Sequence, residues 1–443
     1  MTLASISISN SMKAFGLRSK ELDGIQSGPS ALLALLVSLL PILHQFVSPF
    51  PFLSLGELLL LPIVLLFLIT DLNEIVIDRN LALFYAIPIG LTFIVFFIPN
   101  SYFDLAASIR LIARIALYFF LILICARRID LKTLAGVYSC IALVAGVLLL
   151  LQCFFHYFTS IELPVMRSYC EVLYEYPDSK SLTGEEYYAL FGFRPASIFT
   201  EPSYFAFYMT PLLIMLLFID KKDSPLPAFI ANRKIVFAAF LTITSLFSTS
   251  SAALLVLALI WGLFLFYGLR ESHVRRRGII VVAIVLVSVL VALLLYGLGV
   301  FDVLIARTLS GASLDHRVLR GFVIFETLDP AHQLFGVGLN NHAAYIEANG
   351  IVTAYDEETA NYSFISDVFN RLITSGVIGF VALVCFSLSL FSSSKTKVEK
   401  VFVIVLFVNF CFNSWQYSFR FAFMMIFIYL IRKWMMRKAS TSE

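Results

Sequence analysis

Apolar stretches of helical length recur along the whole chain and constrain its fold more than any other feature. A helix that crosses a bilayer needs about 20 predominantly apolar residues. Only 14% of this chain is charged, whereas roughly a quarter of a soluble domain is charged. The sequence therefore predicts an all-α polytopic membrane protein with about 12 transmembrane helices. The predicted helices lie near residues 31–47, 54–71, 81–98, 105–126, 133–158, 203–219, 235–248, 252–269, 278–299, 364–391, 400–413 and 417–432.

The basic residues predict the orientation of these helices. With both termini in the cytoplasm, 22 of the 32 lysines and arginines fall in cytoplasmic segments and only six fall in outer segments. Cytoplasmic loops of membrane proteins carry an excess of lysine and arginine. The seventh, eleventh and twelfth apolar runs are short, which leaves the number of helices open by two.

This orientation divides the chain into seven segments, two of them long outer loops. Residues 1–30 are polar and no short apolar run with a small-residue cleavage site follows them, so we expect no cleaved signal peptide. The segments are a cytoplasmic tail (1–30), helices 1–5 (31–158), a first long loop (159–202), helices 6–9 (203–299), a second long loop (300–363), helices 10–12 (364–432) and a cytoplasmic tail (433–443).

The first long loop ends in a motif that combines charge with the start of a helix. Arg194 and Glu201 lie seven positions apart, and Pro202, which is favoured in a first helical turn, follows directly. Helix N-termini attract anions, and guanidinium binds phosphate through two parallel hydrogen bonds. We interpret the motif as half of a binding site for a lipid pyrophosphate. Surface pairing is the alternative for Arg194, and a plain N-terminal cap is the alternative for Glu201.

The second long loop holds further cationic and titratable candidates. Arg317 and Arg320 share one face if this stretch is helical, and they suit a phosphate or pair with neighbours such as Asp315. His316, His332 and His342 also lie in this loop, and histidine serves as a base near neutral pH.

Charged residues inside predicted helices are costly and usually face a cavity or a partner. Arg110 and Arg114 lie one turn apart, and Glu57 lies at a similar depth. Arg110 and Arg114 extend a basic cavity inward. Alternatively, Arg110 and Glu57 form a buried ion pair that has no role in substrate binding. Asp367 and Arg371 are four positions apart, so we expect them to neutralise each other. Arg420 has no obvious partner.

Motifs for metals and nucleotides are missing from the sequence. The histidines have no metal-ligand spacing, no Asp-x-Asp is present, and no glycine-rich nucleotide loop follows a strand. We therefore expect no metal, no cofactor and no nucleic-acid partner.

The motif at the end of the first loop resembles a known signature. Arg194-Pro195-Ala196-Ser197-Ile198-Phe199-Thr200-Glu201-Pro202-Ser203 is similar to the Arg-Pro-x-Gly-x-Phe-x-Glu-Pro-Ser run of bacterial O-antigen and exopolysaccharide polymerases of the Wzy type, with Ser197 in place of the glycine. The Ser248-Thr249-Ser250-Ser251 reversal, Arg317 followed by Leu334-Phe335-Gly336-Val337-Gly338-Leu339-Asn340, and the Gly-x-x-Gly of Gly376 and Gly379 are also similar. The resemblance covers roughly residues 190–380.

The resemblance implies a GT-C-like glycosyltransferase of the bacterial inner membrane, active in lipopolysaccharide biosynthesis. Such an enzyme joins undecaprenyl-pyrophosphate-linked oligosaccharide units on the periplasmic side, where both long loops would lie, and works with membrane lipid and a chain-length regulator. Arg194 and Arg317 then hold the departing pyrophosphate. Together with the residues singled out above, the candidate catalytic residues are Arg194, Glu201, Arg317 and His316, and the candidate substrate-binding residues are Arg320, Arg110, Arg114, Pro202, Ser203 and His342.

Two other functions stay open at this point. The related O-antigen ligases carry His-Asn ahead of the Gly-x-x-Gly, where this chain has Phe364-Ile365-Ser366-Asp367, which argues against a ligase. A lipid-linked oligosaccharide flippase or other transporter commonly shows internal repeats and interrupted helices, and we find neither in the sequence.

Overall fold

The computed structural model describes residues 29–50, 53–71, 75–98, 102–159, 193–270, 318–351 and 365–442, with Leu163 and Gly297 as isolated residues. The predicted N-terminal tail up to residue 28, most of the first long loop and the predicted ninth helix (278–299) lie outside the described residues. His316 and Arg317 also lie outside them.

Within the described ranges, regular structure is helical apart from a single antiparallel bridge between Val47 and Ser54. Eleven of the twelve predicted apolar runs lie on described helices. The first half holds α3 (Pro29–Leu43), α4 (Leu55–Asp71), α5 (Arg79–Phe96), α6 (Leu105–Arg128), α7 (Leu131–Thr159), α9 (Pro202–Phe218), the 3₁₀ turn η3 (Lys221–Asp223), α10 (Ala228–Asn232), α11 (Lys234–Phe247) and α12 (Ser251–Arg270). The second half holds α16 (Arg320–Thr327), α17 (Pro330–Phe335), α18 (His342–Ala348), α19 (Asp367–Ser393), α20 (Lys397–Phe412) and α21 (Phe419–Ser442).

Several of these helices have the length and composition of membrane spans. In the described part of the chain, α5, α6, α7, α19 and residues Ser251–Gly268 of α12 are long and apolar enough to cross a bilayer. Shorter apolar helices occur in α3, α4, α9 and α11. The described part of the chain is thus helical apart from one bridge and has helices typical of membrane proteins, whereas the total of twelve spans and the GT-C-like fold stay predictions.

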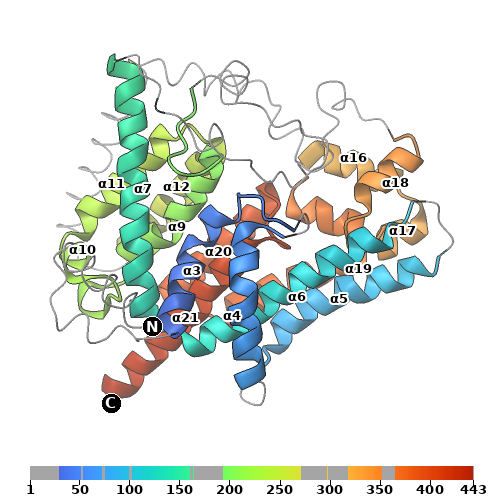
Figure 1. Cartoon of the computed structure of the whole chain (residues 1–443), viewed down its shortest axis with the longest axis horizontal. Helices are drawn as coiled ribbons and strands as arrows, with labels where there is room; N and C mark the ends of the chain where they lie inside the picture. Colours follow the sequence, from blue (N-terminus) through green and yellow to red (C-terminus); the bar gives the residue numbers. More distant parts are fainter. Residues whose placement is uncertain are drawn as a thin grey trace.

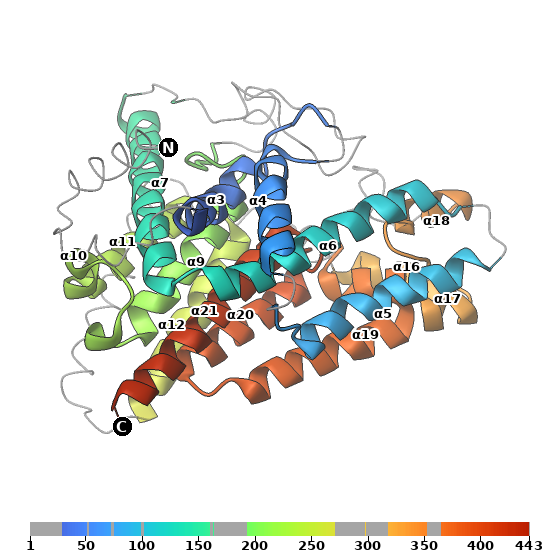
Figure 2. The ribbon, with the colours of Figure 1, turned by 60° about the horizontal axis from the view of Figure 1, so that its bottom comes forward.

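The helices form two groups joined by α20 and α21. In one group α5, α6 and α19 run alongside one another, and α16, α17 and α18 lie at one end of them (Figure 1; Figure 2). The other group contains α3, α7, α9, α11 and α12. Helix α21 contacts α3, α6, α7, α9 and α20, so it connects the two groups.

Helix α21 is central because its residues from Phe421 to Ile428 are apolar on every face of the helix. Every residue from Phe421 to Ile428 is buried, and a helix that is hydrophobic on all faces is stable only when it is surrounded by protein or lipid. The ring of Phe421 stacks on those of Phe84 in α5 and Phe410 in α20. These contacts bury the start of α21 between the two groups of helices.

Basic segments from three parts of the chain meet at one end of the helices. Lys433 Nζ donates to the carbonyls of Ala126 and Arg127 at 2.8 and 3.0 Å. The Trp434 indole N–H donates to the carbonyl of Asp223 at 2.8 Å, and the Arg437 guanidinium lies 3.5 Å from Asp130. The ends of α6 and α21 and the turn η3, which the sequence places on one side of the membrane, therefore lie together.

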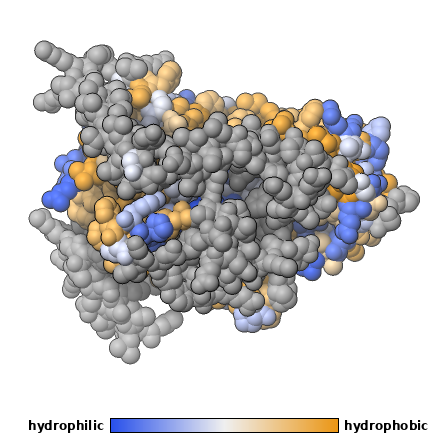
Figure 3. Space-filling model, turned by 90° about the horizontal axis from the view of Figure 1, so that it is seen from above, coloured by the Kyte–Doolittle hydropathy of each residue, from blue (hydrophilic) through white to orange (hydrophobic). Residues whose placement is uncertain are grey.

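The outer helices α16–α18 are attached to α19 through a close contact between two glycine turns. The Val337 N–H donates to the Ile373 carbonyl at 2.9 Å, and the Gly338 N–H donates to the Thr374 carbonyl at 3.0 Å. Gly376 interrupts α19 with φ +61° and ψ −168°, and a Cβ there would lie 2.2 Å from the Leu334 carbonyl oxygen. The two glycine motifs noted in the sequence thus form one junction. In Figure 3 hydrophilic residues gather at the end of the molecule where α16–α18 lie in Figure 1, and apolar residues follow the flank.

Candidate functional site

The segment that carries the Arg194–Ser203 motif is fixed to helix α7. Ser197 has a left-handed backbone (φ +57°), a conformation that favours glycine, which gives a physical reason for the glycine of the polymerase signature at this position. The Gln152 side chain accepts from the Ser197 N–H at 2.8 Å and donates to its carbonyl at 3.2 Å. Ser197 Oγ also donates to the Ala145 carbonyl at 2.6 Å. These three bonds hold the turn in place.

The same segment is tied to the end of helix α3. Thr200 donates both its backbone N–H and its hydroxyl to Oε1 of Gln45, and Gln45 Nε2 donates to the Pro41 carbonyl at 2.7 Å. Gln45 is 2% exposed and Thr200 is 5% exposed, so water does not compete for these bonds. Sequence reasoning missed Gln45 because nothing in its local sequence marks it.

Glu201 and Pro202 occupy the first positions of α9. Pro202 is the first helical residue, as predicted, and Glu201 is the N-cap residue. The Glu201 side chain makes no capping hydrogen bond, so its interpretation as a plain cap is wrong. Ser203 Oγ lies 3.3 Å from Glu201 Oε2 and donates to it. Arg194, half-buried in the same segment, completes the part of the motif that the structure describes.

A pocket opens beside the first turns of α9. Its mouth is lined by Ser203 and Tyr204 of α9, Arg420 of α21, and Asn413 and Trp415 of the α20–α21 connection. The guanidinium carbon of Arg420 lies 4.1 Å from the centroid of the Tyr204 ring and 5.6 Å from that of Phe419. Such a distance to a ring face is typical of a cation–π contact. Arg420, which had no obvious partner in the sequence, is therefore a cation at the mouth of this pocket.

Two residues that we expected to neutralise each other instead hold the α20–α21 connection. The Asp367 carboxylate accepts from the Trp415 N–H at 2.6 Å and the Gln416 N–H at 3.1 Å. Arg371 donates to the Tyr417 hydroxyl at 2.6 Å and lies over the ring of Phe84. Asp367 and Arg371 therefore interact electrostatically but form no direct ion pair, because the carboxylate accepts hydrogen bonds from backbone N–H groups of the α20–α21 connection.

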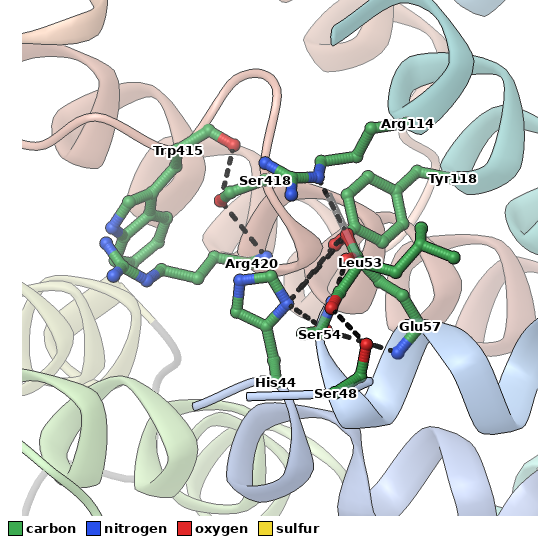
Figure 4. A network of polar contacts seen from close by, with 10 residues as sticks. All are labelled: His44, Ser48, Leu53, Ser54, Glu57, Arg114, Tyr118, Trp415, Ser418 and Arg420. Carbon is green, nitrogen blue, oxygen red and sulfur yellow. Dashed lines mark hydrogen bonds and ion pairs between the residues drawn. The ribbon is translucent and has the colours of Figure 1, made fainter. Parts of the chain in front are cut away.

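A buried polar network adjoins the pocket (Figure 4). Glu57 in α4 is fully buried; its carboxylate lies 2.9 Å from Arg114 Nε, and it accepts from the Tyr118 hydroxyl at 2.6 Å and the Ser54 N–H at 2.8 Å. Ser54 Oγ lies 3.0 Å from Nδ1 of His44, whose ring packs on Phe419 at a centroid distance of 4.3 Å. Through His44 the network therefore contacts Phe419, the residue that precedes Arg420.

The structure separates the two arginines of α6. The alternative of a buried Glu57–Arg110 pair is wrong, because Glu57 pairs with Arg114, one turn further along. Arg110 is 59% exposed and lies 3.9 Å from Asp104 near the start of the helix. One turn of α-helix is about 5.4 Å, which is enough to move a side chain from the buried network to the surface.

The described candidates of the second loop lie in the group of α16–α18, apart from α9 in both views (Figure 1; Figure 2). Arg320 begins α16 and is 1% exposed, and His342 begins α18 and is half-buried. The structure thus does not bring Arg320 or His342 beside the Arg194–Ser203 segment.

His332 forms a chain of three polar side chains near α17. The Tyr102 hydroxyl lies 2.8 Å from His332 Nε2, and Nδ1 of His332 contacts the Asp329 carboxylate. Partial burial acts to raise the pKa of Asp329, but hydrogen bonds from the His332 side chain and backbone outweigh it and lower the pKa. The chain fastens α17 to the connection before α6. Among the described residues, no three His, Cys, Asp or Glu side chains lie close enough together to hold a metal ion.

Comparison with known proteins adds no relative. No protein-family model matches the chain, and no curated protein matches it in sequence.

Proposed function

We propose that this chain is a membrane glycosyltransferase that polymerises undecaprenyl-pyrophosphate-linked oligosaccharide units into O-antigen or a related surface polysaccharide. In this proposal the protein has about twelve spans and a GT-C-like fold and lies in the bacterial inner membrane. Both termini are cytoplasmic, both long loops are periplasmic, and a chain-length regulator is a partner. The reaction takes place at the periplasmic ends of the helices.

One observation supports the proposal most strongly. The segment with the polymerase-like signature begins α9 beside a pocket whose mouth carries the cation Arg420. Hydrogen bonds that Thr200 and Ser197 donate to Gln45 and Gln152 fix this segment to the end of α3 and to α7. A site that stabilises a developing negative charge works best when its groups are held in place before the reaction.

The chemistry needs cations and a base. A hydroxyl of the incoming unit attacks the anomeric carbon of the growing chain, the bond from that carbon to the pyrophosphate oxygen breaks, and a base takes the hydroxyl proton. Arg194 and Arg317 neutralise the charge on the departing lipid pyrophosphate. Glu201, whose side chain makes no capping hydrogen bond, accepts a hydrogen bond from a sugar hydroxyl or orients Arg194, and His316 is the candidate base.

The test is complementation with single variants. Arg194→Ala and Arg317→Ala should each lower polymer formation by roughly 100- to 1,000-fold, as expected when one charge-stabilising group is lost. Arg194→Lys should also fail, because lysine cannot replace two parallel hydrogen bonds. Arg79→Ala is the matched control, since Arg79 is an exposed arginine at the start of α5.

Immunoblots of membrane fractions show whether each variant reaches the membrane. Polymer of normal length from either the Arg194→Ala or the Arg317→Ala variant removes that residue from the mechanism.

A further inference from the structure

We propose that the pocket between α9, α12 and α20 holds the lipid part of a prenyl phosphate, with the phosphate at Arg420 and the first isoprene units between α9 and α12. The inference deepens the proposed function and rests on it for the identity of the lipid. It concerns a different part of the substrate from the sugar and adds Arg420 to the groups that bind it.

The lining of the pocket changes from polar to apolar along α9. Ser203 lies at the start of α9 and Leu213 ten residues later, which corresponds to about 15 Å of helix. Beside Ser203 the walls carry a cation, an indole and an amide group, whereas further along α9 they are mostly aliphatic and aromatic. The lining also includes the polar residues Thr210, Ser245 and Asn409. The apolar lining residues are Ala206, Phe207, Met209, Leu213, Ala252, Ala253, Val256 and Leu257. A ligand that fills this pocket is therefore an amphiphile.

Small residues create the space between α9 and α12. Ala206 of α9 and Ala252 and Ala253 of α12 line the pocket together, close to the reversal that begins α12. Small residues let helices approach or leave room for a ligand, and here the pocket occupies that room. A slender branched chain such as a prenyl chain fits walls of this kind.

Arg420 is suited to the phosphate of such a lipid. Its guanidinium carbon lies over the Tyr204 ring, so stacking engages the face of the group, whereas hydrogen bonds to phosphate use its edge. Asp367 at the start of α19 interacts electrostatically with Arg420, and its carboxylate accepts hydrogen bonds from the Trp415 and Gln416 N–H groups. Arg420 is therefore oriented by an aromatic ring.

The apolar half distinguishes a lipid from a free sugar or a free pyrophosphate. Either polar molecule would occupy only the mouth and would leave the apolar walls in contact with water, which is unfavourable. A prenyl phosphate covers both halves at once. It also places its phosphate next to the α9 N-terminus, where the Arg194–Ser203 segment begins the helix.

The experiment is photolabelling of the full-length protein in detergent with a diazirine-bearing prenyl monophosphate, followed by peptide mapping. We expect the label on α9, on α12 or on the connection before Arg420. Undecaprenyl phosphate should compete with it, and inorganic pyrophosphate and a free oligosaccharide should not. Label that maps elsewhere, or competition by pyrophosphate alone, overturns the inference.

Two variants with matched controls sharpen the test. Ala253→Trp fills the pocket and Arg420→Gln removes its cation, and each should lower labelling roughly tenfold or more, equivalent to about 1.4 kcal/mol in binding. Ala258→Trp places the same side chain on an exposed position of α12, and Arg79→Gln removes an exposed arginine, so both should label like wild type. Unchanged labelling in Ala253→Trp overturns the inference even if Arg420→Gln fails to fold.

The two proposals fail in different ways. If the pocket takes no lipid but the protein is a polymerase, Ala253→Trp makes normal polymer and the wild-type label maps elsewhere. If the pocket takes a lipid but the protein is not a polymerase, the label maps to α9 and α12 while deletion of the chain leaves polymer length unchanged.

Discussion

Replacing Glu57 with glutamine tests the buried network that adjoins the pocket. Glu57 is fully buried and contacts Arg114, Tyr118 and Ser54 at 2.6 to 2.9 Å. Glutamine has nearly the same shape, so Glu57→Gln removes the negative charge and leaves the packing unchanged. It leaves Arg114 without the carboxylate that now faces its Nε.

The expected cost follows from the burial of the pair. Breaking a buried ion pair by removing one partner costs about 3–5 kcal/mol, because the other charge stays in a poorly solvated place. Arg114 keeps 24% of its side-chain exposure, so water compensates for part of this loss. We therefore expect the free energy of unfolding to fall by roughly 3 kcal/mol, at the lower end of that range.

Unfolding in mixed micelles of mild detergent and sodium dodecyl sulfate measures this loss. The double variant Glu57→Gln/Arg114→Gln should recover part of it, since neither charge then remains. Arg110→Gln is the control and should stay within about 1 kcal/mol of wild type, because Arg110 is an exposed arginine on the same helix, 3.9 Å from Asp104. A Glu57→Gln protein as stable as wild type, or a double variant less stable than the single one, refutes the reasoning.

Two further predictions concern the group of α16–α18. Gly376→Ala should lower the free energy of unfolding by at least about 3 kcal/mol, because its φ of +61° strains any other residue and the new Cβ would lie 2.2 Å from the Leu334 carbonyl oxygen. Gly90→Ala, where nothing lies within 4 Å of the new Cβ, should be neutral or stabilising by up to ~1 kcal/mol, and equal effects of the two changes would contradict the account. Asp329 has a lowered pKa when folded, so its contact with His332 stabilises the protein above the unfolded pKa of about 3.9 and is lost as the pH falls through the lower folded value. The stability difference between wild type and Asp329→Asn, below about 1 kcal/mol because Asp329 is half-exposed, should thus be present at pH 7 and shrink progressively as the pH falls below about 3.9, measured by unfolding at pH 7 and at a series of lower pH values.

The helices were predictable because apolar runs of this length have few other structures open to them. The start of α9 was predictable for a second reason: proline at the first helical position fixes the boundary at Pro202. The backbone at Ser197 shows how a local signal and the fold agree, since a glycine in the polymerase signature coincides with a left-handed φ here.

The partners of buried charges were not predictable in the same way. In the sequence Arg110 and Arg114 are equally suitable partners for Glu57. Only the position of α6 along α4 decides that Arg114 forms the ion pair. Asp367 and Arg371 have ideal spacing for an ion pair, yet backbone N–H groups of the α20–α21 connection, 48 residues away along the chain, take the carboxylate.

The pocket could not be predicted from the sequence for a related reason. The α20–α21 connection is short and carries no charged residue before Arg420, so it gives no signal of its own. Arg420 gains its position from the ring of Tyr204, a contact between residues more than 200 positions apart. Gln45 likewise holds Thr200 across 155 positions. Such contacts follow from how the helices pack.

The most direct test of the central proposal is the surface glycolipid pattern of a strain deleted for this chain. On a gel, surface glycolipids with different numbers of repeat units form a ladder of bands. If the chain is a polymerase, this ladder disappears in the deleted strain, lipid A–core carrying a single repeat unit remains, and the wild-type chain restores the ladder. Bare core with long polymer still on the carrier lipid would instead mean a ligase, and bare core with repeat units trapped on the cytoplasmic face would mean a flippase. An unchanged ladder, with capsule and other secreted polysaccharides also unchanged in length, would contradict the proposal.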